Sequence, residues 1–390
     1  MSLTRGAFKF VILIGIISFF ADFVYEGARS VTGPFLGLLG AGAFVVSTVA
    51  GSGELLGYGL RLLSGPLSER TGKFWAITIA GYVVQMVSVP LLAIAGSWQV
   101  AAVLILLERV GKATRNPPRD AMLASASKEI GFGWGFGLHE ALDQFGALVG
   151  PLVIAAVLAV RHSYSQAFAV LAVPAIITLA LVITARALYP RPQDLEAKRS
   201  DVQGKGLPAI FWIYLAGAAL VAAGFADYSL IAYHFARHGV AAMSIPIFYA
   251  TAMAVSGGGS LLFGKLFDRF GMIVLVPLTV LAAAFAPLAF LGNFWLMLAG
   301  AAVWGLGMGV HESIIPAAVA HMVPASRRPS SYGIFTGIYG IAWFAGSAVI
   351  GVLYTRSLTG VVVFCVVTQI IAALIFTWIA MRMRVPRGPY

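Results

Sequence analysis

Long apolar stretches separated by short polar segments run through the whole chain. A helical stretch of about 20 apolar residues spans the ~30 Å hydrocarbon core of a bilayer. The pattern predicts about twelve such helices, over residues 8–32, 43–64, 74–95, 98–119, 134–160, 165–188, 209–236, 244–265, 272–292, 294–322, 330–354 and 358–381. The alternating polarity that is typical of membrane β-barrels is absent, so we expect an all-α membrane protein.

The composition supports this interpretation. The 390-residue chain is 60% hydrophobic and only 11% charged, whereas soluble domains are about one quarter charged. We therefore expect a multi-pass protein of the cell membrane (inner or plasma) that contacts lipid, works as a monomer and binds no nucleic acid. The single cysteine, Cys365, lies in an apolar stretch and excludes a disulfide between two cysteines of the chain.

The basic residues indicate the topology. One set of loops and both termini carry most of them, whereas the alternate loops hold little beyond Arg161, Arg237 and Arg356. The basic set comprises Arg5, Lys9, Arg70, Lys73, Arg115, Arg119, Lys128, Arg191, Lys198, Arg199, Lys205, Lys265, Arg269, Arg327, Arg328, Arg382, Arg384 and Arg387. By the positive-inside rule both termini are cytoplasmic, as an even number of spans also requires.

The two halves of the chain resemble each other. A hydrophilic segment rich in proline, glycine and charge separates residues 1–188 from residues 209–390, so we expect a cytoplasmic linker at 189–208 between two six-helix bundles. Gly65-Pro-Leu-Ser-Glu69-Arg70-Thr-Gly72-Lys73 after the second span is echoed by Gly264-Lys-Leu-Phe-Asp268-Arg269-Phe-Gly271-Met272 after the eighth. Parallel repeats of this kind are typical of secondary transporters.

These motifs resemble those of the major facilitator superfamily. The loop from Gly65 to Lys73 is similar to the family signature between helices two and three, with Glu69 where aspartate is usual. Gly146, Gly150 and Pro151 in span five resemble the family's antiporter motif, although Ile154 and Ala155 replace further glycines. The resemblance implies an alternating-access carrier that uses neither ATP nor covalent chemistry, and so no enzyme. It also implies that Gly65, Glu69, Arg70, Gly72, Asp268 and Arg269 act as a conformational latch.

The first span carries a charged face. Asp22, Glu26 and Arg29 have the spacing i, i+4, i+7, which places them on one side of a helix. A charge in mid-membrane costs about 3 kcal/mol on insertion scales, so this face must contact protein or water. Two interpretations stay open: a buried ion-pair strut that fixes helix packing, or a site for protons or substrate.

Other spans of the first half add buried charge at similar depth. The candidates are Glu54, Glu108, Arg109, Glu140 and Asp143. Crowded carboxylates in a medium of low dielectric favour the binding of a proton, and Arg109 could serve as the counter-ion. The alternative is a static ion-pair network around Arg29, Arg61 and Arg109. We expect Pro117-Pro118 to break or kink span four near the cytoplasm. Arg109, Lys112 and Arg119 do not fit a lipid face, so the end of this span, which also includes Arg115, forms a basic interfacial elbow or a gate that pairs with acids of the other bundle.

Span five also offers donor atoms for a metal. His139, Glu140 and Asp143 share one helix face, which could hold a divalent ion. The second histidine of the zinc-protease pattern is missing, since Asp143 stands there. We predict no resident metal and no cofactor.

Fewer polar groups lie in the second half. Asp227 and His234 share a helix face, and His311-Glu312 follows a glycine-rich stretch in span ten, so these residues could line a cavity or pack. Tyr249, Trp304, Tyr332, Tyr339 and Trp343 are plausible cavity aromatics, or belong to the packing.

Together the patterns favour a secondary transporter that couples protons to the export of a small organic molecule. A proton-coupled importer and a divalent-metal carrier are alternatives within transport. A membrane receptor or assembly protein that moves nothing is the alternative of another class.

Overall fold

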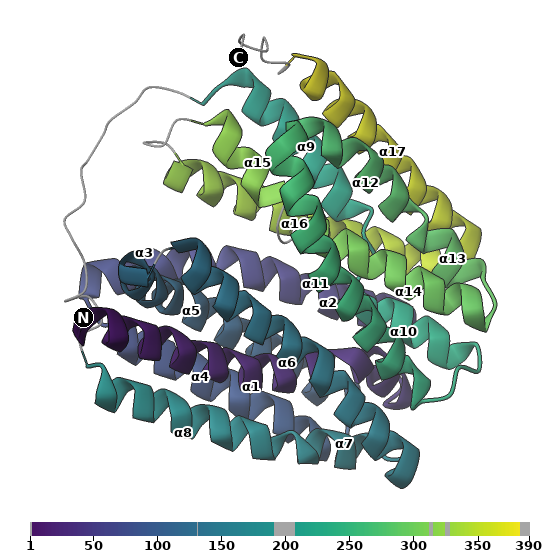
Figure 1. Ribbon diagram of the computed structural model, residues 1–390. Helices are drawn as coiled ribbons and strands as arrows, with labels where there is room; N and C mark the ends of the chain where they lie inside the picture. Colours follow the sequence, from purple (N-terminus) through teal and green to yellow (C-terminus); the bar gives the residue numbers. More distant parts are fainter. Residues whose placement is uncertain (1, 131, 191–206, 312–314, 324–327, 383–390) are drawn as a thin grey trace. The chain divides into compact units, whose positions relative to one another are not determined.

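The computed structural model describes residues 2–130, 132–190, 207–311, 315–323 and 328–382, and every long regular element in these ranges is a helix (Figure 1). The first part of the chain contains α1 (Ser2–Leu38), α2 (Ala43–Gly59), α3 (Arg61–Thr71), α4 (Phe74–Leu91), α5 (Trp98–Ile130), α6 (Phe132–Arg161), α7 (Tyr164–Val170) and α8 (Ala172–Leu188). The second contains α9 (Ala209–Ala223), α10 (Tyr228–Arg237), α11 (Ser244–Phe270), α12 (Leu275–Ala283), α13 (Phe285–Leu291), α14 (Phe294–Gly309), α15 (Ile315–Met322), α16 (Arg328–Arg356) and α17 (Leu358–Arg382).

Contacts divide the chain into two compact units. Unit 1 comprises Met1–Ser200 and Tyr228–Ala250, and unit 2 comprises Asp201–Asp227 and Thr251–Tyr390. Residues 228–250 therefore group with the first unit although they follow the predicted linker. The division of the chain at 189–208 into two six-helix bundles stays a prediction.

Ten of the helical segments in the described residues are long and apolar enough to cross a membrane. The protein is therefore a multi-pass membrane protein. Two predicted spans lie outside these ten: α5 carries several charges, and α14 has 16 residues. The number of twelve spans and the cytoplasmic location of both termini stay predictions.

The proline pair of span four does not end its helix. α5 continues through Pro117 and Pro118 to Ile130, so the expected break is wrong. Pro117 has no N–H to donate to the carbonyl of Ala113, four residues earlier. The Ser64 hydroxyl donates to that carbonyl at 2.9 Å instead. The chain thus replaces the lost hydrogen bond from α3, as an apolar environment requires.

Several predicted spans are interrupted helices. The span predicted at 209–236 divides into α9 and α10, with Gly224 to Asp227 between them. Trp304 Nε1 donates to the carbonyl of Ala226 at 2.8 Å and so satisfies a backbone group in this break. Non-helical backbone at membrane depth occurs where protein or water can bind its polar groups. Asp227, which is 1% exposed, lies at this point.

Candidate functional site

Three charged side chains of α1 lie inside unit 1. Asp22, Glu26 and Arg29 are 7%, 7% and 6% exposed. All three contact side chains of neighbouring helices, as described below. The charged face predicted from the spacing is therefore covered by protein, as the cost of charge in hydrocarbon requires.

The cations that meet the two acids come from α5. Arg115 Nη2 lies 3.6 Å from Asp22 Oδ1. Lys112 Nζ lies 4.0 Å from Asp22 Oδ1 and 3.9 Å from Glu26 Oε1, and it sits 3.8 Å from the ring centroid of Tyr25. Asp22 meets Arg115, whereas Glu26, one turn later on α1, meets Lys112, one turn earlier on α5. The two helices therefore run antiparallel, with their polar faces in contact.

The interpretation of Arg115 and Arg119 as a basic cytoplasmic elbow is wrong. Arg115 is 0% exposed and Arg119 is 6% exposed, and both lie within α5. α5 packs against α1 and α4 on either side of the proline pair, and these contacts bury both residues.

An ion cluster around Glu54 joins α1, α2 and α5. Glu54 Oε1 accepts a hydrogen bond from Arg29 Nη2 at 3.1 Å and lies 3.2 Å from Arg109 Nη1. The Tyr25 hydroxyl oxygen accepts from both guanidinium groups. This is the static network considered from the sequence, except that Arg61 is exposed and lies over the ring of Tyr58.

A second chain of hydrogen bonds links α4 to α5. Gln85 donates through Nε2 to Glu108 Oε1 at 2.9 Å and accepts through Oε1 from Arg115 Nε at 2.6 Å. Arg115 also donates to the Tyr82 hydroxyl at 3.1 Å. Gln85 therefore connects the acid beside Arg109 with the cation beside Asp22.

Asp22 is bound differently from Glu54. Its Oδ1 is buried and, among the described residues, has no hydrogen-bond partner, and the same holds for Arg115 Nη2. The 3.6 Å between these two atoms exceeds the normal length of a hydrogen bond. Asp22 thus receives charge compensation from two cations but no hydrogen bond to this oxygen.

A small cavity lies within unit 1 beside the ion cluster around Glu54. Tyr25, Arg29, Glu108 and Arg109 form its polar side. Apolar residues that include Val46, Ala50, Leu92 and Ile105 form the rest. An apolar wall with a few convergent polar groups is typical of sites for small molecules.

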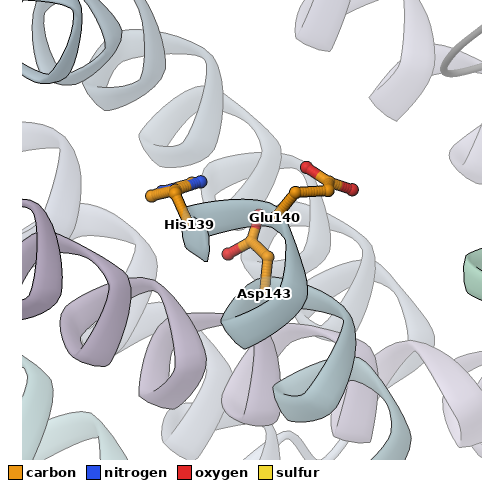
Figure 2. A group of neighbouring side chains, drawn as sticks. All are labelled: His139, Glu140 and Asp143. Carbon is orange, nitrogen blue, oxygen red and sulfur yellow. The ribbon is translucent and has the colours of Figure 1, made fainter. Parts of the chain in front are cut away.

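The metal candidates lie together on α6. Figure 2 shows His139, Glu140 and Asp143, whose donor atoms lie within 4.8 Å of one another. Ser18 Oγ lies 2.7 Å from His139 Nε2 and accepts from Arg119 Nη1 at 2.9 Å. The Ser18 hydroxyl therefore links the guanidinium of α5 to the imidazole of α6. This arrangement and the nearby guanidinium disfavour a divalent cation, and the absence of a resident metal stays a prediction.

Glu140 lies apart from the buried network. Its side chain is exposed and accepts from Gln144 Nε2 at 3.0 Å. Asp143 is half-buried, and its Oδ1 has no hydrogen-bond partner in the part of the chain that the structure describes. The predicted layer of carboxylates therefore contains Asp22, Glu26, Glu54 and Glu108, with Asp143 at its edge and Glu140 outside it.

The glycines of the span-five motif hold α6 against α1. A Cβ added at Gly146 would meet the carbonyl of Phe19, and one added at Gly150 would meet the carbonyl of Phe23. Only glycine permits so close an approach of two backbones. These contacts lie three residues before Asp22 and one residue after it, and buried Pro151 follows in α6.

The loop motif and its repeat share a backbone conformation. Gly72 has φ +68° at the end of α3, and Gly271 has φ +66° at the end of α11, both in the left-handed region. Gly65 faces the Pro117 side chain, whereas Glu69 and Arg70 are exposed. Arg269 lies over the ring of Phe270, and the side chain of Asp268 lies outside the described part. The latch role of this motif stays a prediction.

The polar residues of the second half meet aromatic rings. His311 is 3% exposed, and its Nδ1 lies 2.5 Å from the Tyr339 hydroxyl. The rings of Phe225 and Trp343 lie 4.2 and 5.2 Å from its imidazole. Glu312 lies outside the described residues. Trp304, Tyr339 and Trp343 are packed core side chains of unit 2.

Tyr25 and Gln85 belong to the network but did not emerge from the sequence as site residues, and Lys112 and Arg115 emerged only as part of the basic end of span four. Lys112 lies one turn from Glu108 and Arg115 two turns from it, so helical periodicity on span four was an available signal. Gln85 gave no such signal, because it is a lone amide in an apolar stretch.

Comparison with known proteins identifies the class. The sequence profile of the Major Facilitator Superfamily matches residues 13–292. The chain therefore belongs to this superfamily of membrane transporters, which are not enzymes.

Two relatives extend this result. An uncharacterized protein of Mycobacterium tuberculosis (strain ATCC 25618 / H37Rv) is 41% identical over 390 residues, which cover 98% of this chain and 94% of the relative. An uncharacterized MFS-type transporter of Methanocaldococcus jannaschii is 30% identical over 176 residues, 45% of this chain and 44% of the relative.

Solved structures share the fold. A POT family transporter in complex with a thioalcohol-conjugated peptide has a TM-score of 0.77 at 11% identity, over 96% of each chain. The nucleoside transporter NupG has a TM-score of 0.72 at 14% identity, over 96% of this chain and 98% of NupG. At these identities the likeness shows the fold alone.

Proposed function

We propose that the protein is a proton-coupled secondary transporter that exports a small organic molecule, with Asp22 as the group that binds the proton. One observation carries the proposal: Asp22 Oδ1 is buried, receives no hydrogen bond from the described residues, and lies 3.6 and 4.0 Å from two cations. A carboxylate with one oxygen that accepts no hydrogen bond gives up less on protonation than one with both oxygens bonded. Glu54, with two guanidinium partners, is the opposite case and serves as a structural acid.

A proton on Asp22 changes the charge balance of the network. The four acids Asp22, Glu26, Glu54 and Glu108 face the four cations Arg29, Arg109, Lys112 and Arg115. When Asp22 becomes neutral, Lys112 retains its ion pair with Glu26 and its contact with the Tyr25 ring, and the network gains one positive charge. This change gives the two protonation states different preferred packings, which is what coupling to alternating access needs.

The direction of transport rests on the span-five motif, which resembles that of antiporters. Gly146 and Gly150 contact α1 on either side of Asp22, so the motif and the proton site share one helix contact. Proton release at Asp22 and repacking of α1 on α6 would then be one event. Import driven by protons uses the same residues and is the second candidate.

We also propose that the protein has twelve spans, in which α5 and α14–α15 complete the ten apolar ones. Both termini are cytoplasmic, and the protein functions as a monomer.

The proposal is tested with Asp22→Asn in proteoliposomes. A ligand found by thermal-shift screening of drugs and metabolites serves as the transported probe. We expect Asp22→Asn, which mimics the protonated acid, to retain counterflow of the ligand but to lose accumulation driven by a proton gradient.

The matched control is Glu140→Gln, which removes an exposed carboxylate outside the buried network and should keep both activities. If gradient-driven transport by Asp22→Asn persists at the wild-type level, Asp22 is not the proton carrier. If the wild-type protein binds the ligand but shows no counterflow, the result would favour a receptor or assembly role instead.

A further inference from the structure

One end of α1 packs tightly against α10, a helix from later in the chain. α10 and residues 244–250 of α11 belong to unit 1 with α1. A Cβ added at Gly33 would meet the backbone of Ser229, and one added at Gly37 would lie 2.8 Å from the Tyr233 ring. Thr32 Oγ1 lies 3.2 Å from Ser229 Oγ. We call this contact the α1–α10 seam.

Tyr249 joins the seam to the charged face of α1. Its side chain is 0% exposed, and its hydroxyl donates a hydrogen bond to Glu26 Oε2. The other oxygen of Glu26, Oε1, lies 3.9 Å from Lys112 Nζ. Glu26 thus binds α11 with one oxygen and faces the network of α5 with the other. Tyr228, the first residue of α10, packs its ring 4.4 Å from that of Tyr249.

We propose that Tyr249 is a positioning residue that makes closure of the α1–α10 seam depend on the charge of Glu26. A phenol that donates to a carboxylate forms a charge-assisted hydrogen bond, roughly twice as strong as one to a neutral acceptor. While Glu26 is ionised, this bond holds α10 and α11 on α1. When Glu26 binds a proton, the bond weakens and the seam opens. The inference rests on the proposed proton coupling and adds the residue that transmits it to the helices.

Ionisable groups besides Tyr249 lie on α1 and on the helices that pack against it. They are Asp22, Tyr25 and Arg29 on α1, Glu54 on α2, Glu108, Arg109, Lys112 and Arg115 on α5, His139 and Asp143 on α6, and Tyr228, Tyr233 and His234 on α10. Asp22 shares Lys112 with Glu26, so a proton on one acid strengthens the hold of the lysine on the other. Among the interactions described here, only Glu26 couples this network to α11 through a tyrosine hydroxyl. The contribution of Glu26 can therefore be separated by a double-mutant cycle.

The test needs no substrate. Spin labels are attached at Leu38→Cys and Ala242→Cys in a Cys365→Ser background, since both positions are exposed in unit 1 at the ends of the seam. Distance distributions are measured by double electron–electron resonance at high and at low pH. We expect one short distance at high pH and a second, longer population at low pH.

Tyr249→Phe and Glu26→Gln should each raise the open fraction at high pH by ~10-fold, the loss expected for one charge-assisted hydrogen bond. In the Glu26→Gln background Tyr249→Phe should add little. The matched control is Tyr228→Phe, which removes a buried hydroxyl that donates to the Ile245 carbonyl at 2.9 Å. This control should keep the pH dependence of the wild type.

Equal effects of Tyr249→Phe in both backgrounds would show that the hydroxyl acts independently of the charge of Glu26, and would overturn the inference. A wild-type distribution that does not change with pH would overturn it as well. If Tyr249→Phe does not fold, Glu26→Asp gives the same test, because the shortened side chain withdraws the carboxylate from the hydroxyl. Failure of the proton proposal appears separately, as gradient-driven transport that persists in Asp22→Asn while the Tyr249–Glu26 cycle still shows coupling.

Discussion

Glu54→Gln separates the structural part of the charge network from its proposed proton-binding part. The substitution keeps the size of the side chain but removes the negative charge between Arg29 and Arg109. The three side chains are 11%, 6% and 10% exposed, so water screens little of the interaction. Removal of one partner from a buried ion pair costs about 3–5 kcal/mol. For a domain of this size that loss corresponds to a fall in Tm of roughly 10 °C.

The assay is thermal unfolding of the purified protein in lipid nanodiscs, followed by tryptophan fluorescence. Asp22→Asn is the comparison, and we expect it to lose only about 1 kcal/mol, because Arg115 keeps Gln85 and Lys112 keeps Glu26. A Glu54→Gln protein as stable as the wild type would refute this reasoning. Glu54 would then be neutral in the native state, and it would replace Asp22 as the candidate proton carrier.

Three further predictions concern the family motifs and the metal candidates. Gly150→Leu should push α6 away from α1 and shift the distances between spin labels on these helices. The control Gly137→Leu, on the same helix but with open space around it, should leave these distances unchanged. If Gly150→Leu leaves the distances unchanged and transport normal, the motif has no part in the mechanism. Gly72→Leu should slow transport but preserve ligand affinity, since a backbone φ of +68° strains leucine. The control Gly72→Asn should be tolerated, because asparagine adopts this conformation more readily. Lost affinity with normal turnover per bound ligand would contradict the latch. Elemental analysis of chelator-washed protein should find no stoichiometric zinc, manganese or iron, and a tightly bound metal that His139→Ala removes would support a metal carrier.

Hydropathy and periodicity were sufficient to predict most of the membrane-spanning helices and the charged face of α1. A bilayer allows few backbone solutions, so apolar length alone identifies most spans. The spacing of Asp22, Glu26 and Arg29 then requires a protein-covered face. Both inferences depend on neighbours along the chain, which a sequence displays directly.

The partners of these residues depend on contacts that the sequence does not display. Lys112 meets Asp22 and Glu26 because two helices about 90 residues apart pack in one particular register. α5 continues through Pro117, and Ser64, some 50 residues earlier, supplies the hydrogen bond that this proline cannot. Local rules for proline predict a break there, and a side chain from α3 removes the reason for it.

The two interpretations of the charged face apply to different ends of one network. Around Glu54, two guanidinium groups and a shared tyrosine hydroxyl satisfy the charge, so this end has the properties of a strut. Around Asp22, two cations lie near an oxygen that accepts no hydrogen bond from the described residues, so this end has the properties of a site whose charge can change. Glu26 lies between them on the same helix and carries the bond to Tyr249. In our proposal a rigid end holds α1 in place while a change of charge one or two turns away alters its packing against α6, α10 and α11.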